Sequence, residues 1–294
     1  MVSNNPKISV VLNAFKRTEH LESQLDAIES QTVKPDHIYV WQNHGGIIPP
    51  EIKKRVTLVE CSDNLGVWAR FAFALNCDSE YICLFDDDTI PGKKWFENCL
   101  NTMKTHSGLL GTRGLKYLSR SAYEPYIDVG WKNPNNEVEQ VDIVGHCWFF
   151  KREHLSLFWQ ELPELNYSKT SGEDIHFSYM LQKNGIGTFV PPHPSDDLEL
   201  WGSQPESGKK LGGSSVGISI NADSNTKFDI AYRHYIAKGF SLVLSNKERL
   251  KEGVVIGPGL TKNKHIRNVV NKSPKLTKIA KSFVRWLKKN KIHI

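Results

Sequence analysis

The chain lacks long apolar stretches and has few cysteines. Nowhere in its 294 residues is there a run near the roughly 18 consecutive apolar residues that a membrane-spanning helix needs. The polar start, residues 1–7, does not have the basic-then-apolar pattern of a signal peptide. Five scattered cysteines, none spaced as C-x-x-C, give no indication of a disulfide framework or a zinc site. We therefore expect a cytoplasmic protein that does not span a membrane.

Acidic residues are absent from the last segment. Residues 262–294 contain 11 Lys and Arg and no Asp or Glu. Since the whole chain carries +6, the residues before this segment carry a net −5. A hydrophobic content of 39% and a charged content of 24% are typical of a globular protein and exclude a fibrous or globally disordered chain. We expect a folded domain over residues 1–260 and a separate basic tail over residues 261–294.

The tail has apolar residues at helical spacing. Lysines and arginines surround the other side of this stripe, which consists of Leu276, Ile279, Ala280, Phe283, Trp286 and Leu287. Such a stripe can enter the headgroup region of a bilayer, and each basic residue near an anionic leaflet contributes about 1 kcal/mol. We predict peripheral binding to an anionic membrane surface, the inner face of the cell membrane. Docking of the stripe on the folded domain is the alternative, and a continuous apolar stripe argues against a nucleic-acid partner.

Strand and helix patterns alternate in the first hundred residues. Strand patterns cover residues 8–12, 37–41, 56–59 and 81–85, and helical patterns cover 18–31 and 67–75. The second half has an apolar run at 141–150, a helical pattern at 173–182, a strand pattern at 187–190, loop composition at 203–215 and a helical pattern at 227–238. The fold class is therefore α/β, with a mostly parallel sheet flanked by helices. Ligands of such sheets bind beyond the carboxyl ends of the strands.

Three consecutive carboxylates, Asp86, Asp87 and Asp88, follow the strand pattern at 81–85 directly. Like charges this close repel one another, and a divalent cation is the simplest way to stabilise them. All-oxygen ligation favours Mg²⁺, Mn²⁺ or Ca²⁺ over zinc. A solvated acidic turn is the alternative.

The order of the motifs resembles glycosyltransferase family 2, which has the GT-A fold, over about residues 7–200. The matching segments are 8–17 (ISVVLNAFKR), 64–70 (NLGVWAR), 81–91 (YICLFDDDTIP), 144–145 ahead of the apolar 147–150, and 172–175 (GEDI). The form DDD-x-x-P is also similar to exostosin-type transferases. This resemblance implies a Rossmann-like GT-A catalytic domain over residues 1–260 and metal-dependent transfer of a sugar from a nucleotide-diphosphate donor.

The resemblance implies a donor and metal site. Asp86 and Asp88 would form the D-x-D pair, with Asp88 binding Mn²⁺ or Mg²⁺, Asp86 as a further ligand, and Asp86 or Asp87 facing the donor. A cation that bridges diphosphate oxygens stabilises the leaving group. His193, after the strand pattern at 187–190, is the expected imidazole ligand. Further donor contacts are expected from Asn13, Arg17, Asn43, Asn64 and Arg70.

Glu173 and Asp174 begin a helical pattern, where exposed amide groups and the helix dipole favour a carboxylate. Helix capping alone is the alternative. By resemblance the pair supplies the catalytic base, with Asp174 deprotonating the acceptor hydroxyl and Glu173 supporting the site or touching the acceptor. Three tryptophans are candidates for stacking on sugars, each weighed against a place in the core: Trp131, Trp148 and Trp201.

Asn43 stands where many family members have an Asp that reads the nucleotide base, so the nucleotide is not predicted. We expect an inverting hexosyltransferase of surface polysaccharide biosynthesis with a glycan or lipid-linked glycan acceptor. A retaining, exostosin-like transferase and a non-enzymatic carbohydrate- or nucleic-acid-binding protein are the alternatives.

Overall fold

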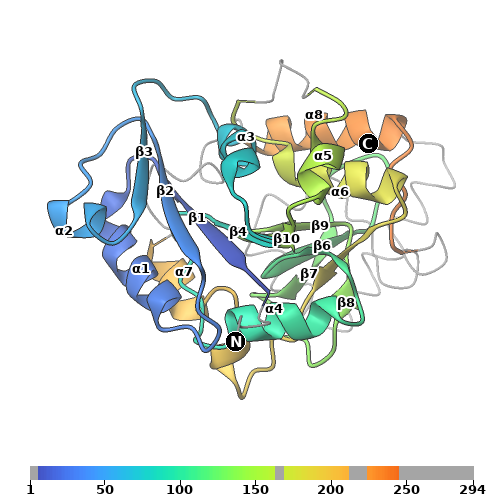
Figure 1. Ribbon diagram of the computed structural model, residues 1–294. Helices are drawn as coiled ribbons and strands as arrows, with labels where there is room; N and C mark the ends of the chain where they lie inside the picture. Colours follow the sequence, from blue (N-terminus) through green and yellow to red (C-terminus); the bar gives the residue numbers. More distant parts are fainter. Residues whose placement is uncertain (1–5, 163–168, 212–223, 245–294) are drawn as a thin grey trace, which may run out of the picture.

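Within the described residues, the strands form two sheets (Figure 1). The computed structural model describes residues 6–162, 169–211 and 224–244. The strands are β1 (Ile8–Ala14), β2 (His37–Asn43), β3 (Thr57–Cys61), β4 (Tyr81–Phe85), β5 (Gly108–Leu110), β6 (Arg113–Tyr117), β7 (Tyr126–Gly130), β8 (Glu139–Gln140), β9 (Ile143–Gly145), β10 (Cys147–Lys151) and β11 (Gly187–Val190). The helices are α1 (Leu21–Glu29), α2 (Pro50–Lys53), α3 (Ala69–Phe73), α4 (Trp95–Met103), α5 (His154–Phe158), α6 (Glu173–Lys183), α7 (Pro205–Leu211) and α8 (Ser224–Ala237).

The main sheet has the order β3-β2-β1-β4-β10-β5-β11-β8, and the small sheet has the order β7-β6-β9. The first four strands of the main sheet run parallel to one another. β10 runs antiparallel to both of its neighbours, and β8 runs antiparallel to β11. The predicted fold class, a mostly parallel sheet flanked by helices, is confirmed.

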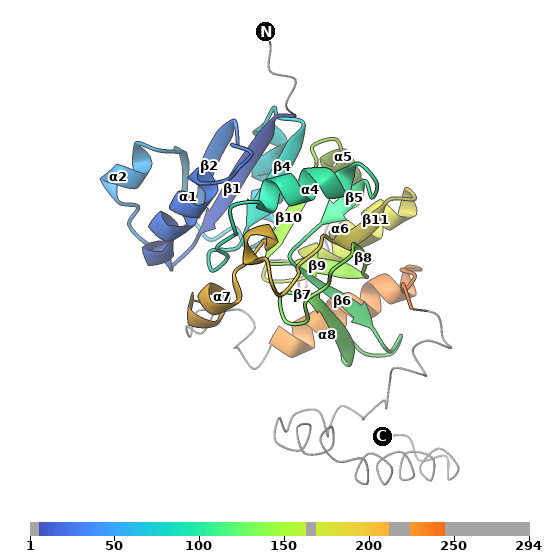
Figure 2. The ribbon, with the colours of Figure 1, turned by 90° about the horizontal axis from the view of Figure 1, so that it is seen from below.

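Strands β1 and β4 are uninterrupted apolar runs because both of their faces are covered. Along β1, Val10 and Leu12 face a layer that contains α1 and α4. Val11 points the other way, into a layer that contains α3, α5 and α6. Figure 2 shows α1 and α4 together on one side of the main sheet. The sheet therefore separates two hydrophobic cores.

The apolar run at 141–150 is divided between the two sheets. β9 belongs to the small sheet and β10 to the main sheet, and His146 joins them with a left-handed backbone (φ 66°). Pairing of Cys147 with Phe85 then brings His146 beside Asp86, whose amide donates to the His146 carbonyl over 3.0 Å. The turn between the sheets thus lies at the carboxyl end of β4.

The prediction of a loop at 203–215 is wrong for the first part of that segment, because α7 occupies Pro205–Leu211. Proline is well suited to the first helical position, and an Arg17 guanidinium N–H donates to the carbonyl of Leu211 at the other end over 3.2 Å. The helix predicted at 227–238 is confirmed as α8. The basic tail at 261–294 lies outside the described residues. Within the described part of the chain, no helix has both the length and the hydropathy required to cross a membrane.

Candidate active site

A buried arginine joins the two acidic motifs. Arg70 lies on α3, and its guanidinium contacts Asp86 Oδ1 at 2.5 Å and Glu173 Oε1 at 3.2 Å. The Arg70 side chain is only 3% exposed, and its guanidinium carbon lies 4.3 Å from the ring centre of Trp148. Residues from α3, the end of β4 and the start of α6 therefore meet around one positive charge.

Arg17 binds the other two carboxylates of the strand end. It forms two hydrogen bonds with the carboxylate of Asp87 and a longer contact of 3.4 Å with Asp88 Oδ2. Burial raises the pKa of Asp87, and burial together with the charge of Asp86 raises the pKa of Asp88. Asp88 is thus the least compensated carboxylate of the three.

The carboxylates after β4 suit a divalent cation whose other ligands come from a substrate. Among the residues described here, no group of three or more His, Cys, Asp or Glu side chains is arranged to hold a metal ion by itself. Mg²⁺ is usually held by one or two carboxylates, with substrate phosphates and water completing its shell. Asp88 and Asp86 match that requirement. The charge of Asp88 is compensated only by the 3.4 Å contact with Arg17, and Asp86 keeps one carboxylate oxygen outside its ion pair with Arg70.

The second acidic motif begins α6. Gly172 precedes the helix in a left-handed conformation (φ 93°), and Asp174 Oδ1 accepts from the Ile175 amide over 2.7 Å. Burial, then the neighbouring Asp174 carboxylate, raises the pKa of Glu173 to about 8, while Arg70 opposes the shift. Burial also raises the pKa of Asp174 to about 6. A carboxyl group with such a pKa is suited to general-base chemistry near neutral pH.

The N-x-G motif holds the start of this acidic segment in place. The carbonyl of Lys169 accepts from the Val67 amide over 2.9 Å, and the carbonyl of Ser171 accepts from the Trp68 indole over 3.2 Å. Gly66 has φ 79°, and a Cβ placed there would lie 1.9 Å from the Lys169 carbonyl oxygen. Glycine is therefore required where the two motifs touch.

The Asn43 side chain holds the loop of the N-x-G motif, residues 64–66, in place. Its amide donates to Asn64 Oδ1 over 3.1 Å and to the Gly66 carbonyl over 3.2 Å, and its Oδ1 accepts from the Leu65 amide over 2.8 Å. Asn64 Oδ1 also accepts from the Gly66 amide over 2.9 Å. Both N–H groups of the Asn43 amide are thus occupied, which leaves it poorly suited to read a base. Asn13 is half-buried near the end of β1, beside the Arg17 loop.

His193 does not fit the predicted metal site. The side chain is fully buried, with Nδ1 2.7 Å from the Pro191 carbonyl oxygen. Its Nε2 lies 2.9 Å from Thr112 Oγ1 and 3.3 Å from the Gly202 amide. Both ring nitrogens are engaged by the protein, so in this arrangement neither is available to a cation.

Two of the three candidate sugar-stacking tryptophans belong to the core. Trp148 lies under Arg70, and Trp201 is buried with its indole N–H donating to the Pro194 carbonyl over 2.7 Å. Trp131 remains half-buried, 5.0 Å from the ring of His146. His146 is a residue of the site region that the sequence did not indicate, because its position beside Asp86 depends on the pairing of β10 with β4.

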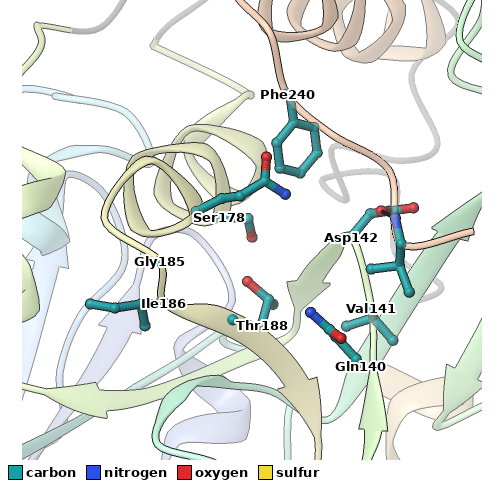
Figure 3. Close-up of a pocket in the computed structure, with 11 residues that line it drawn as sticks. Gln140, Val141, Asp142, Ser178, Gly185, Ile186, Thr188 and Phe240 are labelled. Carbon is teal, nitrogen blue, oxygen red and sulfur yellow. Dashed lines mark hydrogen bonds between the residues drawn. The ribbon is translucent and has the colours of Figure 1, made fainter.

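A separate set of residues lines a cavity of about 210 Å³ (Figure 3). Polar side chains from α6, β11 and β8 line it, including Ser178, Thr188 and Gln140. Asp142 in its wall accepts from the amides of Tyr117 and Val243, both over 2.6 Å. None of the predicted site residues lines this cavity.

No protein-family model matches the chain, and no curated protein sequence matches it. Among solved structures, the mannosyltransferase PcManGT from Pyrobaculum calidifontis, in complex with GDP-Man and Mn²⁺, aligns with a TM-score of 0.48 and 17% identity over 98% of this chain and 89% of that chain. A structure of S. aureus TarS residues 1–349 aligns with a TM-score of 0.48 and 14% identity, over 83% of this chain and 77% of that chain. A longer TarS structure gives a TM-score of 0.46 and 13% identity, over 88% of this chain and 50% of that chain. Likenesses this distant carry no argument about substrate or mechanism. The mostly parallel main sheet does place the acidic segment at the carboxyl end of β4, as the motifs predict.

Proposed function

We propose that the chain is a metal-dependent glycosyltransferase of surface polysaccharide biosynthesis. It moves a sugar from a nucleotide-diphosphate donor to a hydroxyl group of a glycan or lipid-linked glycan. The observation that carries this proposal is the buried Arg70, which ties the acidic end of β4 to the acidic start of α6. A donor site and a base for the acceptor are then adjacent, as single-step transfer requires.

The donor side is formed by the residues after β1 and β4. Asp88 and Asp86 would hold Mn²⁺ or Mg²⁺, which when bound stabilises the charge of the departing diphosphate. Arg17 holds Asp87 and lies within 3.4 Å of Asp88, so it positions these carboxylates. Asn43 and Asn64 shape the neighbouring loop, and Asn13 borders the same edge of the sheet.

The acceptor side is formed by Asp174 and Glu173. Asp174 accepts the proton of the attacking hydroxyl, because burial raises its pKa toward the range of an effective base. Glu173 stays bound to Arg70 and holds the start of α6 toward Asp86. One base and one displacement give inversion at the anomeric carbon. NMR of the product anomer tests this choice, and a retained configuration favours the exostosin-like alternative.

A thermal-shift screen of nucleotide sugars, with and without Mn²⁺, tests the proposed function. A donor at 100 times its Kd stabilises the fold by about 2.7 kcal/mol. For a chain of this size that amounts to a rise in Tm of about 5–11 °C. The rise should depend on Mn²⁺ and should be lost in Asp88→Asn. Absence of a shift with every uridine, guanosine, cytidine and thymidine diphosphate sugar would refute the proposal.

The division into a catalytic domain at residues 1–260 and a basic tail at 261–294 is part of the proposal. The tail is proposed to bind an anionic membrane surface peripherally, which would bring the active site close to a lipid-linked acceptor. Its support is the sequence pattern alone, an apolar stripe surrounded by basic residues in a segment that contains eleven Lys and Arg and no Asp or Glu.

A further inference from the structure

Arg17 places a positive charge at a fixed position beside the acidic end of β4. Its Nε and Nη2 both donate to the carboxylate of Asp87, with Nε 3.1 Å from Oδ2. Its Nη1 donates to the Leu211 carbonyl at the end of α7 over 3.2 Å. The side chains of Arg17 and Asp87 are only 10% and 12% exposed. Because a two-bond pair of guanidinium and carboxylate is geometrically specific, these contacts hold Arg17 from two sides.

The charge of Arg17 also reaches Asp88. Arg17 Nη2 lies 3.4 Å from Asp88 Oδ2, and the Asp88 side chain is 19% exposed. A cation on Asp88 would therefore lie beside a guanidinium that Asp87 and Leu211 keep in place. Like charges this close repel one another, and solvent and salt screen the repulsion less where the groups are partly buried. Arg17 thus lowers the affinity of Asp88 for a cation.

The pairing of charges at the strand end leads to the same result. Two of the three carboxylates have a guanidinium partner. Arg70 contacts Asp86 at 2.5 Å, and Asp87 is bound by Arg17. Asp88 then carries one negative charge that only the 3.4 Å contact offsets. A divalent cation brings one positive charge more than Asp88 can neutralise, so a ligand with its own negative charge, such as a diphosphate, is needed to balance it.

We infer that Arg17 selects a nucleoside diphosphate with its bound cation over the free cation. The inference rests on the proposed function, because it takes the nucleotide-diphosphate donor and the cation at Asp88 from that function. The guanidinium repels a free divalent ion and attracts the phosphate groups of the donor. Arg17 is therefore a specificity-determining residue of the donor site, in addition to its role in holding Asp87.

Arg17→Gln tests the inference through two affinities that should change in opposite directions. The variant loses the positive charge and keeps an amide that can donate to Asp87. Electron paramagnetic resonance of unbound Mn²⁺ measures the Kd of the ion alone, which should fall about tenfold or more because the repulsion is lost. Calorimetric titration with GDP-mannose and UDP-glucose at saturating Mn²⁺ measures the Kd of the conjugate. For the conjugate that wild type binds, this Kd should rise about tenfold because the attraction of the phosphates is lost.

Two further variants separate the charge of Arg17 from its shape and from the net charge of the chain. Arg17→Lys keeps the charge but cannot form the two-bond pair with Asp87, so the Kd of Mn²⁺ alone should stay within about threefold of wild type. Lys16→Gln is the matched control for loss of one positive charge. Lys16 is adjacent in the chain and exposed, with Nζ 5.2 Å from the ring centre of Phe15. This variant should leave the Kd of Mn²⁺ alone within about twofold of wild type, since solvent screens an exposed charge.

Three results would overturn the inference and leave the proposed function intact. In Arg17→Gln, a weaker or unchanged affinity for Mn²⁺ alone, or an unchanged affinity for the conjugate, would show that Arg17 only holds the carboxylates in place. An equal gain in Mn²⁺ affinity in Arg17→Lys and Arg17→Gln would show that the charge is not the cause.

The third result comes from wild type and does not depend on the stability of a variant. Wild type should bind Mn²⁺ at least about tenfold more weakly alone than with a saturating conjugate, and equal affinities would overturn the inference. Failure of wild type to bind either conjugate in Mn²⁺ would count against the proposed function and the inference together.

Discussion

Replacement of Arg70 by methionine tests the cluster on which the proposed site depends. The side chain is 3% exposed and contacts Asp86 at 2.5 Å and Glu173 at 3.2 Å, so its removal leaves the buried Glu173 and the partly exposed Asp86 without their cation. Removing one partner of a buried ion pair costs about 3–5 kcal/mol. For a chain of this size we expect Tm to fall by about 6–20 °C.

The loss of stability caused by Arg70→Met should depend on pH in a definite direction. Burial already raises the pKa of Glu173, and loss of the Arg70 charge raises it further. A carboxyl group whose pKa is higher in the folded than in the unfolded state stabilises the fold when protonated, and this contribution is lost as pH rises through the folded pKa. Because the pKa of Glu173 is about 8 in wild type, both proteins lose this contribution in parallel up to that pH, and the free energy of unfolding of Arg70→Met should fall further below that of wild type as pH rises above 8.

Arg55→Met is the matched control for this measurement. Arg55 also contacts two carboxylates, Asp26 at 2.5 Å and Glu29 at 2.7 Å, but its side chain is 28% exposed. Exposed ion pairs contribute about 0–1 kcal/mol. Urea denaturation followed by far-UV circular dichroism, once below pH 8 and once well above it, measures both variants. Equal, pH-independent losses for Arg70→Met and Arg55→Met would refute the argument that Arg70 compensates buried charge.

The remaining predictions concern the base, the metal and the tail. Asp174→Asn should lower kcat about 10²- to 10⁴-fold and leave donor Kd unchanged, and a matching loss of donor affinity would contradict the assignment of Asp174 as the base. Wild-type kcat should rise with pH through about 6, because a base accepts a proton only when ionised. Asp88→Asn should abolish metal-dependent donor binding in calorimetry while the circular dichroism spectrum is kept, and wild-type turnover in this variant would argue against Asp88 as a ligand. Truncation before Lys262 should abolish sedimentation with anionic vesicles and spare transfer to a soluble acceptor. High salt should release the full chain from the vesicles because it screens surface charge. Equal vesicle binding by the truncated chain would show that the tail is not the anchor.

Local sequence determined much of the fold. The apolar runs of β1 and β4 have no polar face, which indicates central strands covered on both sides, and the spacing of Leu21, Leu25 and Ile28 defines the buried face of α1. The carboxylates at 86–88 follow β4 because the apolar run ends there. These features depend on residues that are neighbours in the chain, so a single sequence was enough to predict them.

Tertiary structure decided which side chains serve the site. Asn43 ends β2 and His193 comes shortly after β11, but contacts with residues far along the chain occupy their polar atoms. Asn43 is bound to Gly66, and His193 is bound to Thr112. His146 reaches Asp86 only because β10 enters the sheet antiparallel to β4.

Arg70 shows the same division between sequence and structure. Its place on a helix after the N-x-G motif could be predicted from the sequence. Its simultaneous contact with Asp86 and Glu173, 16 and 103 residues away, could not, because the packing of α3 and α6 on one face of the sheet produces it. The sequence by itself determined the kinds of residues available for catalysis, and the tertiary structure decided which of them meet, because distances between side chains depend on how sheets and helices pack.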